Sequence, residues 1–567
     1  MKRWDIIKKF QISNFKFQIK DIIKMLLENR GVKTKKEKEL FLNPPDPYTL
    51  SAEDVEINNE QLKKATTRIK KAIKNKESIV VYADYDADGI TAGAIMWETI
   101  HGLGGNIMPY IPHRVEEGYG LSVKGIDQVI ADYHPGLIVT VDHGITAKEK
   151  VSYAKKQGID VIVTDHHTKP KALPECTIVH TTTLCGAGVA WFVAKELLRV
   201  LKGSHLVSVQ GETLTELTAI GTIADMVPLV GANRAIVKYG LEAINKTSRV
   251  GLEALIADAG LTVGALGTYE VSHMLAPRLN AMGRLEHALD ALRMLCTKQK
   301  EKAMLLAQKL GLTNKERQQL TLDTLTHALD ALKGVTLHRQ GDTLKKLIFI
   351  SHESYNQGVI GLVAGKLVEE FYRPAIVVSK GEFISKASAR SVSGFNIVEA
   401  IRSCSDILVD VGGHPMAAGF TVETARLEIL QERMEEIAAK QLTEEQLIRT
   451  LHIDMEIPLE AVTEDLWNAL RDFEPFGFGN AEPVFMTRTV LVKDARLVGK
   501  DGKHLKLRIT NHESRITIDA IAFGMGELYG KLKSDQPVDI AYTIDMNVWN
   551  GSKKLQLKVK DVQLLPQ

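Results

Sequence analysis

The chain has 567 residues and a mass of 62.7 kDa, with 44% hydrophobic and 25% charged residues. These fractions are typical of globular proteins, so they exclude a disordered or fibrous chain, and the length predicts roughly three to five domains. No apolar run approaches the ~18–20 residues of a membrane span, and residues 1–9 lack the apolar core of a signal peptide. Four cysteines without Cys-x-x-Cys spacing indicate reduced thiols in a cytoplasmic protein.

The net charge of +2 is unevenly distributed along the chain. Residues 486–567 carry 14 Lys and Arg against 9 Asp and Glu, so the C-terminal part is basic and the remainder slightly acidic. A basic module fits a polyanionic ligand, although an ordinary solvated surface explains the surplus equally well.

The first part of the chain predicts an α/β domain. Residues 1–77 have the pattern of a charged helical segment, with a breaker cluster at 43–47. Beyond it, β-branched runs alternate with amphipathic stretches, which predicts a parallel sheet with helices on both faces. The predicted strands are 78–84, 106–112, 137–142 and 160–165, and the predicted helices lie near 91–103, 122–133 and 147–157.

The rest of the chain predicts three further regions. Residues 213–335 are mainly helical, including the long charged stretch 298–333. A second strand–helix region follows, with strands at 346–351, 374–379 and 386–390, helices near 359–371 and 396–403, a Gly-rich turn at 411–419 and a surface helix at 425–447. Five short strands, 488–498, 503–510, 515–523, 537–545 and 554–563, then predict a small barrel of the OB-fold type.

The most informative stretch begins where the strand 78–84 ends. Asp84, Asp86 and Asp88 stand at alternate positions there, and Gly89 follows them before a predicted helix. Ligands of open α/β sheets bind outside the carboxyl ends of the strands, and three clustered carboxylates repel one another unless a cation lies between them. A polar turn in which Asp88 caps the helix is the alternative interpretation, whereas a calcium loop is disfavoured because its distal Glu is missing.

The same pattern recurs on two more predicted strands. The strand at 137–142 ends in Asp142 and His143, and the strand at 160–165 ends in Asp165, His166 and His167. An apolar segment further along ends in Asp225. Carboxylates with one or two imidazoles suit Mn²⁺ or Mg²⁺, and six or seven ligands predict two ions that assist hydrolysis of a phosphoester.

These motifs together resemble a known superfamily. The segments Asp84–Gly89, Asp142–Gly144, Asp165–His167 and Gly221–Asp225 resemble, in this order, the four motifs of the DHH phosphoesterases. Segments 112–120, 276–284 and 473–480 are similar to RecJ, a family of bacterial single-stranded-DNA exonucleases, and segments 388–391 and 412–419 resemble the DHHA1 companion domain. The resemblance covers nearly the whole chain beyond residue 30.

The resemblance implies a fold class and a set of boundaries. We expect an α/β protein with two doubly wound parallel-sheet domains (DHH and DHHA1), a helical connector and a C-terminal OB-fold β-barrel. The expected parts are a helical N-terminal segment (1–77), the DHH domain (78–290), a helical connector (291–340), the DHHA1 domain (341–447), a linker (448–485) and the OB-fold (486–567).

The resemblance also implies roles for individual residues. It makes Asp84, Asp86, Asp88, Asp142, His166 and Asp225 ligands of two divalent ions, Mn²⁺ or Mg²⁺. It places His167 beside the scissile phosphate, and we expect Asp165 and Arg278 to take part in catalysis with it. His143 has no assigned role. For Arg278 and Arg284 the alternative is an ion pair with Glu286 or Asp290.

A third group of residues is expected to bind the nucleic acid. Arg114 and Tyr119 suit phosphate neutralisation and base stacking, and Arg284 suits phosphate binding. The 5′-terminal phosphate of the strand is expected to be held by Ser388, Arg390, Gly412, Gly413 and His414. The simpler interpretations are a tight turn for the two glycines and a surface ion pair for Arg390. On the barrel, Lys503, Lys506, Arg508, Lys553, Lys554 and Lys558, with Trp549 and Tyr542, fit a single-strand-binding surface.

The function expected from the resemblance is single-stranded-DNA-specific 5′→3′ exonuclease activity that releases 5′-mononucleotides in DNA repair and recombination. Two alternatives stay open: a DHH phosphodiesterase of short oligonucleotides or cyclic dinucleotides, and a non-catalytic DNA-binding scaffold. The basic barrel and the intact motifs disfavour them. Single-stranded DNA is the expected partner of a cytoplasmic monomer, with a helicase and a single-strand-binding protein as further candidates.

Overall fold

The computed structural model describes residues 2–7, 18–202, 207–334, 345–511, 516–532, 534–549 and 552–565. The chain divides into two compact units, each built from separate segments. The larger unit contains residues 58–224 and 244–449, and the smaller contains residues 1–57, 225–243 and 450–567. Within the described residues, no helix has both the length and the apolar character that crossing a membrane requires.

A five-stranded parallel sheet organises the first part of the larger unit. Its strands are β2 (Ser78–Ala83), β3 (Asn106–Tyr110), β4 (Leu137–Val141), β5 (Asp160–Asp165) and β6 (Thr177–His180), in the order β3-β2-β4-β5-β6. The first four confirm the predicted strands, whereas β6 was not predicted from the sequence. Because the chain passes from β2 to β3 and then returns across β2 to β4, the strand order reverses beside β2. Ligands of doubly wound sheets bind at this point.

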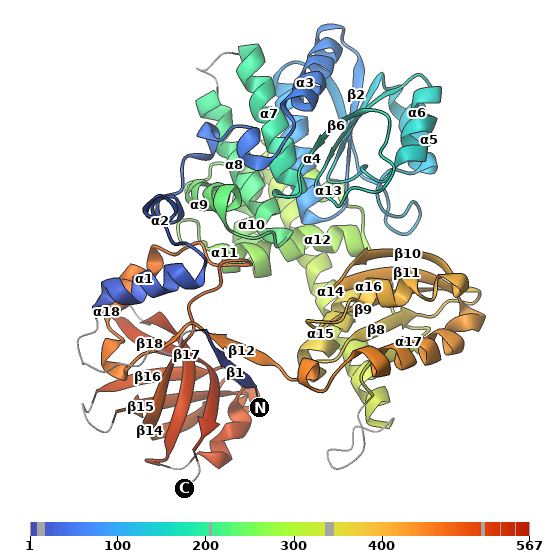
Figure 1. Ribbon diagram of the computed structural model, residues 1–567. Helices are drawn as coiled ribbons and strands as arrows, with labels where there is room; N and C mark the ends of the chain where they lie inside the picture. The colour runs from blue at the N-terminus through green and yellow to red at the C-terminus, as the bar shows by residue number, and fades with distance from the viewer. Residues whose placement is uncertain are drawn as a thin grey trace. The chain divides into compact units, whose positions relative to one another are not determined.

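Helices cover both faces of this sheet (Figure 1). One face carries α5 (Val123–Tyr133) and α6 (Lys148–Lys156), and the other carries α3 (Asn59–Lys74), α4 (Ala87–Gly102) and α7 (Gly186–Lys202). The central strands are buried on both sides, since residues 79–83 are fully inaccessible. This burial explains why they are continuous apolar runs rather than alternating ones.

A mainly helical region follows, as predicted. It contains α8 (Val207–Ala224), α9 (Gly231–Ile244), α10 (Val250–Asp258), α11 (Thr268–Glu270), α12 (Ala276–Leu285), α13 (Leu289–Cys296) and the long α14 (Lys300–Gly334). Helix α14 packs against α10, α12 and α13 and also against α15 of the next domain.

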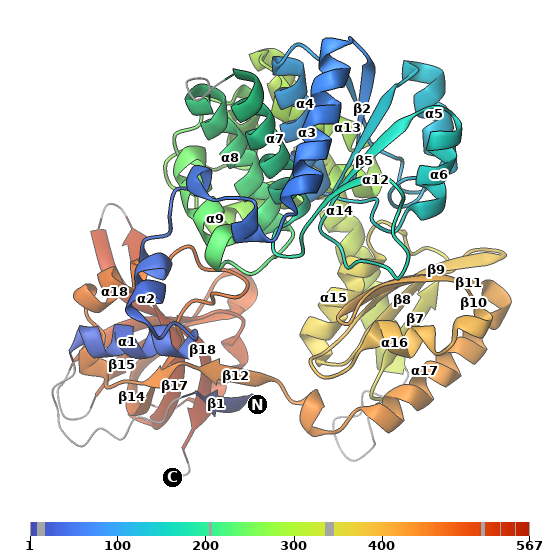
Figure 2. The ribbon, with the colours of Figure 1, turned by 45° about the horizontal axis from the view of Figure 1, so that its top comes forward.

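The second sheet of the larger unit has the order β10-β11-β9-β8-β7. Its strands are β7 (Ile348–His352), β8 (Ala375–Ser379), β9 (Ile384–Arg390), β10 (Leu408–His414) and β11 (Ala417–Glu423). Helices α16 (Ile397–Arg402) and α17 (Leu427–Gln441) cover one face, and α15 (Ile360–Phe371) with the end of α14 covers the other (Figure 2).

This second sheet differs in detail from the predicted parallel arrangement. Only β7 and β8 are parallel, and the other neighbours are antiparallel. The connections explain the difference: four residues join β8 to β9 and two join β10 to β11, while a parallel pair needs a crossover of about a dozen residues. The predicted Gly-rich turn at 411–419 is therefore a β-hairpin whose turn is Pro415–Met416.

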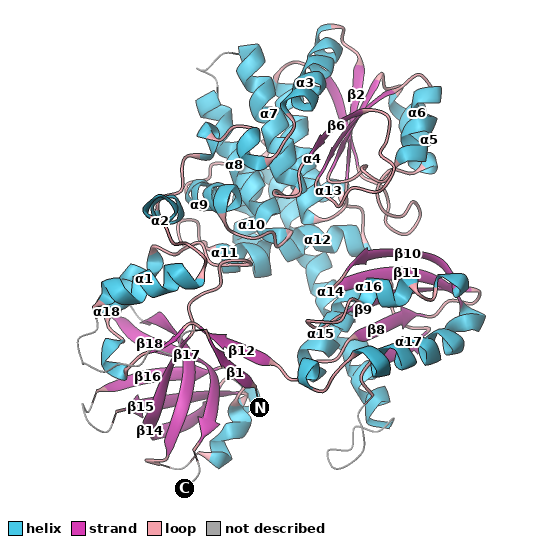
Figure 3. Cartoon of the chain, in the orientation of Figure 1, coloured by secondary structure: helices cyan, strands magenta, loops and turns pink. Residues whose placement is uncertain are grey.

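The smaller unit contains a closed barrel (Figure 3). Strands β14 (Phe485–Val498), β15 (His504–Thr510), β16 (Thr517–Ala522), β17 (Pro537–Trp549) and β18 (Ser552–Leu564) form it, and pairing of β14 with β17 closes the ring. The fold class predicted from the sequence, two α/β domains and an OB-type barrel, is thereby confirmed. A short β13 (Met455–Glu456) pairs with β14 in parallel. Strand β1 (Arg3–Ile6), which falls in the segment predicted to be helical, pairs with β12 (Thr450–Ile453).

Three helices of the smaller unit share the barrel's apolar core. Helices α1 (Ile19–Asn29) and α18 (Glu464–Arg471) bury leucine and isoleucine side chains in it, and α2 (Lys35–Leu42) contributes Phe41. Arg234 is 1% exposed and donates hydrogen bonds to the carbonyls of Phe41, Phe473 and Glu474. This guanidinium thus ties α9 to residues 473–480 of the smaller unit.

Candidate metal centre and phosphate site

The predicted acidic and imidazole residues follow the carboxyl ends of β2, β4 and β5. Asp84 directly follows β2, Asp142 follows β4, and Asp165 is the last residue of β5. Since parallel neighbours end at the same edge, their side chains meet beside the reversal of strand order.

Three overlapping groups of these side chains have ligand atoms within 4.8 Å of one another. They are Asp84 with Asp86 and Asp142, Asp142 with His166 and His167, and Asp88 with His166 and Asp225. Asp225 directly follows α8, and this helix brings it to the site. The structure therefore brings all six predicted metal ligands together, and Asp142 and His166 each belong to two groups.

The surroundings of Asp84 and Asp86 disfavour the ionised form of both carboxylates. Burial, reinforced by the charge of Asp86, raises the pKa of Asp84 well above its ordinary value. Burial and the charge of Asp88 likewise raise the pKa of Asp86. In the described part of the chain Asp84 Oδ1 is buried without a hydrogen-bond partner. A buried carboxylate oxygen of this kind is what a hard cation such as Mn²⁺ or Mg²⁺ binds, so the donor set fits these ions.

Asp86 and Asp88 also anchor the starts of two helices. Asp86 Oδ1 accepts hydrogen bonds from the backbone N–H groups of Asp88 and Gly89, so it is Asp86, and not Asp88, that caps α4. Asp88 instead accepts from the N–H groups of Gly186 and Ala187, at 2.6 and 2.8 Å, at the start of α7. Both carboxylates are therefore oriented by helix N-termini, which favour negative charge.

Asp142 has a left-handed backbone, with φ of 67°. Asp and Asn tolerate this conformation better than other residues with a Cβ atom. A Cβ atom at Gly186 would lie only 2.5 Å from the side chain of Asp142, so the glycine at the start of α7 allows this close approach.

His167 is linked to both Asp165 and Tyr119. Asp165 Oδ1 lies 2.8 Å from His167 Nδ1, and the Tyr119 hydroxyl lies 3.2 Å from His167 Nε2. Burial acts to raise the pKa of Asp165, but the hydrogen bond and charge of His167, with backbone N–H donors that include Ile145, outweigh it and hold that pKa below its usual range. Asp165 therefore stays ionised and fixes the orientation of the imidazole.

His143, which the sequence left without a role, is a buried structural residue. It is 1% exposed, its Nε2 lies 3.0 Å from the Tyr82 carbonyl, and burial lowers its pKa to about 4.

Several predicted phosphate-binding residues lie beside the metal centre. Arg114 stacks over Tyr85, with Cζ 5.0 Å from the ring centre, and Tyr85 lies between Asp84 and Asp86 in the chain. Arg284 donates to the Gly358 carbonyl at 3.1 Å, and burial followed by the charges of neighbouring arginines lowers its pKa to about 10.

The second sheet of this unit also contributes to the site. The ring of His414 is stacked against that of His167 with the ring centres 6.2 Å apart, so the β10–β11 hairpin reaches the histidine that the sequence predicts to be catalytic. Gly413 has φ of 141°, and a Cβ atom there would lie 2.3 Å from the Ala417 carbonyl, so this hairpin requires glycine. Arg390 donates to Ser388 Oγ at 3.2 Å on β9, the neighbouring strand of β11. Gly412 precedes Gly413 on β10, and a Cβ atom at Gly412 would meet only open space.

Arg278 lies apart from these contacts. Its guanidinium binds Asp258 Oδ2 at 3.1 Å and the Met274 carbonyl, rather than Glu286 or Asp290.

Two further residues that support the site have no role in the sequence-based prediction. Asn280 Oδ1 accepts a hydrogen bond from the N–H of Ala87 at 2.7 Å, beside the Asp86 cap. Glu117 accepts from the Tyr110 hydroxyl and the His113 N–H, which fixes the loop that carries Arg114 and Tyr119. Both residues lie in motifs that resemble RecJ, but only the fold shows what they contact.

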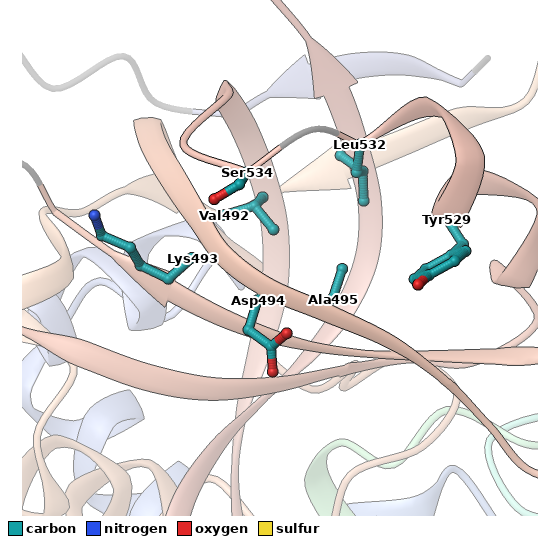
Figure 4. Close-up of a pocket in the computed structure, with 7 residues that line it drawn as sticks. All are labelled: Val492, Lys493, Asp494, Ala495, Tyr529, Leu532 and Ser534. Carbon is teal, nitrogen blue, oxygen red and sulfur yellow. The ribbon is translucent and has the colours of Figure 1, made fainter.

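The barrel is less well matched to the predicted single-strand-binding surface. Tyr542 is fully buried, and its hydroxyl lies 2.8 Å from Thr487 Oγ1, so its ring cannot stack on a base; the side chain of Trp549 lies outside the described residues. Lys558 is paired with Asp545. A pocket of about 390 Å³ opens beside the β-bulge of β14, where Lys493, Asp494 and Tyr529 line it (Figure 4).

Comparisons with known proteins place the chain in a family. Three family models match it: the DHH family N-terminal domain at residues 78–222, the DHHA1 domain at 344–440 and the RecJ OB domain at 453–561. The single-stranded-DNA-specific exonuclease RecJ of Bacillus subtilis is 36% identical and aligns with 99% of this chain and 70% of its own length. The Escherichia coli protein of the same name is 30% identical, with 96% of each chain covered.

Solved structures of RecJ proteins are also similar to this chain. The crystal structure of Thermus thermophilus RecJ in complex with Mn²⁺ matches with a TM-score of 0.82 and 29% identity, covering 100% of this chain and 80% of the other. The Mg²⁺ complex of the same protein gives a TM-score of 0.77 at 28% identity, covering 100% and 79%. With three domain matches in order and relatives aligned over nearly its full length, this chain belongs to the RecJ family.

Proposed function

We propose that this chain is a single-stranded-DNA-specific exonuclease that hydrolyses phosphodiester bonds in the 5′→3′ direction and releases 5′-mononucleotides in DNA repair and recombination. The observation that carries the proposal is the convergence of six predicted metal ligands into three overlapping groups. Its membership of the RecJ family, whose relatives are named for single-stranded-DNA-specific exonuclease activity, supports the choice of substrate.

The proposed ligands of two divalent ions, Mn²⁺ or Mg²⁺, are Asp84, Asp86, Asp88, Asp142, His166 and Asp225. When bound, the ions would neutralise charge on the scissile phosphate and act as Lewis acids. The protein's contribution is orientation, since helix N-termini hold Asp86 and Asp88 before any ion arrives.

His167 is the proposed proton-transfer residue. Asp165 is bonded to Nδ1, so Nε2 is the ring atom that exchanges a proton with the reacting group. Hydrolysis adds water to phosphorus and breaks its bond to the 3′ oxygen of the terminal nucleotide, which leaves with a proton. Arg278 stays a predicted catalytic residue, and its ion pair with Asp258 favours a positioning role.

Capture of the 5′ end explains the proposed polarity. Arg284, Ser388, Arg390 and the hairpin residues Gly412, Gly413 and His414 would bind the terminal phosphate, while Arg114 and Tyr119 bind the strand behind it. Hydrolysis beside the proposed metal ligands would then occur at a fixed distance from the end. Each cleavage leaves a new 5′-phosphate, so the shortened strand has the end that the next cycle requires.

Other properties follow from family membership as proposals. We expect the domain boundaries given above, a cytoplasmic location, a monomeric state, and a helicase and a single-strand-binding protein as partners. Single-stranded DNA is the partner for which the RecJ OB domain match gives support.

The test is digestion of end-labelled 30-nucleotide strands, single and double, with Mn²⁺ or Mg²⁺. We expect mononucleotides from single strands only. We also expect Asp142→Asn to lose activity, and Asn is the replacement that the left-handed backbone at this position tolerates. Glu149→Gln, at an exposed position of α6, is the matched control for loss of one acidic charge. Cleavage of dinucleotides but not of 30-mers would favour the phosphodiesterase alternative, and no cleavage with either ion would favour a scaffold.

A further inference from the structure

Two exposed histidines lie against each other where the end of α14 meets the second sheet. His327 belongs to the last turns of α14, and His352 is the last residue of β7. Their ring centres are 4.4 Å apart, and the ring planes are inclined by 50°. Neither histidine belongs to a motif on which the proposed function depends, so this contact is a feature of the chain that the function leaves unexplained.

The apolar packing beneath the two histidines holds their backbones in place. Leu325 and Leu329 of α14 pack against a core cluster that includes Ile350 of β7 and Tyr355. Tyr355 is 2% exposed, and its ring centre lies 5.5 Å from the ring centre of each histidine. Because this packing does not involve the imidazoles, their contact is preorganised by the fold.

The Nδ1 atom of each imidazole contacts a hydroxyl group. His327 Nδ1 lies 2.9 Å from the Tyr355 hydroxyl, and His352 Nδ1 lies 2.8 Å from Ser354 Oγ, with the Ser354 N–H at 3.2 Å. Within the described part of the chain neither Nε2 atom makes a hydrogen bond. A hydroxyl accepts as well as donates, so each ring can carry its proton on Nδ1 and offer the Nε2 lone pair to a ligand. In His352 this exchanges the longer bond from the Ser354 N–H for donation to Oγ.

The chemistry of this pair differs from that of the metal centre at the strand ends. Among the described residues, no group of three or more His, Cys, Asp and Glu ligands includes either histidine, so the pair offers two nitrogen donors that water would supplement. Imidazole nitrogens suit Zn²⁺, Ni²⁺ and Cu²⁺, whereas carboxylates suit Mn²⁺ and Mg²⁺. The pair therefore selects a different class of cation.

We propose that His327 and His352 bind one Zn²⁺ ion through their Nε2 atoms, at a site separate from the proposed catalytic ions. An ion about 2.0–2.1 Å from each nitrogen spans two rings whose centres are 4.4 Å apart. The hydroxyls of Tyr355 and Ser354 then accept the Nδ1 protons and orient the imidazoles, as outer partners of metal-bound histidines do. The ion would join α14 to β7, and the inference does not depend on the proposed function.

Conservative variants isolate the pair. His327→Gln and His352→Gln each remove one imidazole and keep a polar side chain, and Tyr355→Phe removes only the hydroxyl behind His327. The matched control is His101→Gln, because His101 is also exposed but its ring stacks on Trp97, with the ring centres 4.8 Å apart. Circular dichroism and thermal unfolding without metal establish that each variant is folded. Either His→Gln variant is sufficient for the test if the other does not fold.

Binding is measured by calorimetric titration of the full-length, metal-free protein with Zn²⁺. The centre at the strand ends contributes the same binding events in every variant, so a change between variants reports on the pair. We expect His327→Gln and His352→Gln to weaken one binding event at least about 100-fold, Tyr355→Phe to weaken it about tenfold and His101→Gln to leave it within twofold. Equal titrations of the unmodified protein and a His→Gln variant would overturn the inference.

Nuclear magnetic resonance of protein labelled at histidine shows whether one ion contacts both rings. The signals that disappear in His327→Gln and in His352→Gln identify the two imidazoles. We expect both signals to move together as Zn²⁺ is added, while the signal of His101 stays in place. Movement of one of the two alone, or an equal movement of the His101 signal, would show binding to separate exposed histidines and would also overturn the inference.

Discussion

The side chains of Asp165 and His167 are hydrogen-bonded at 2.8 Å between Oδ1 and Nδ1, and the same carboxylate accepts backbone hydrogen bonds from His166, His167 and Ile145. The carboxylate therefore sets both the direction of the imidazole and the nitrogen that carries the proton. Both members of this acid–imidazole pair come from the end of one strand, β5, and not from two distant segments.

Asp165→Asn should impair catalysis without impairing DNA binding. The amide can present its N–H to Nδ1, which would place the imidazole proton on Nε2 and reverse its role. We expect kcat to fall at least about 100-fold, while the affinity for single strands measured in Ca²⁺ or EDTA changes less than threefold. A parallel loss of affinity and unfolding temperature would show instead that Asp165 serves the fold.

We expect Tyr119 to have two separable functions, because its hydroxyl contacts His167 while 51% of the residue is exposed. Tyr119→Phe removes the hydroxyl and should lower kcat several-fold with KM unchanged. Tyr119→Ala also removes the ring and should raise KM for long strands, since base stacking contributes roughly 1–3 kcal/mol. Identical kinetics for the two variants would leave the ring without a role in binding.

Removing one carboxylate from the metal centre should stabilise the protein when no metal is present. Burial and the charge of Asp86 raise the pKa of Asp84, so its ionised form opposes folding. We expect Asp84→Asn to unfold at a higher temperature than the unmodified protein in EDTA and to gain less from added Mn²⁺. Scanning calorimetry in both conditions makes the comparison, and a lower unfolding temperature in EDTA would contradict it.

His143 should make the protein less stable in acid. Its pKa of about 4 lies below the ordinary 6.5, so the unfolded state binds the proton first as the pH falls. The free energy of unfolding therefore begins to fall near pH 6.5, and the fall is complete near pH 4 and amounts to about 3 kcal/mol. His143→Gln, which can still donate to the Tyr82 carbonyl, should remove most of this dependence in urea unfolding at pH 7.5 and 4.5. An unchanged difference between the two pH values would exclude His143 as the source.

The barrel is better tested by point substitution than by deletion, because α1 and α18 share its core and removal of residues 486–567 would expose them. Arg496 and Lys506 face each other across β14 and β15. Replacing both residues with Glu should raise KM for long strands several-fold and leave KM for short strands unchanged. The control Lys531→Glu, on the exposed segment after β16, should change KM for neither length. The ratio of kcat/KM for 60-mers and 8-mers is the measurement, and an unchanged ratio would argue against DNA binding by this face.

The acidic and imidazole side chains that meet at the strand ends could be predicted from the sequence. Apolar runs that end in Asp or His predict strands, and parallel strands deliver such residues to one edge, so Asp84, Asp142 and His166 were expected to meet. The five barrel strands and the long helix were equally visible, because periodicity is a local property. The hairpin at 411–419 was missed because its glycines and its two-residue turn obscure the alternation of a strand.

The contacts of each of those side chains could not be predicted from the sequence, because they depend on how the elements pack together. Asp86 caps α4, while Asp88 faces the start of α7, which lies about a hundred residues away in the chain. Tyr542, which the sequence offered as a base-stacking residue, is buried in the barrel. The direction and the neighbours of a side chain are set by packing between elements far apart in the sequence, and the spacing of residues along the chain does not reveal that packing.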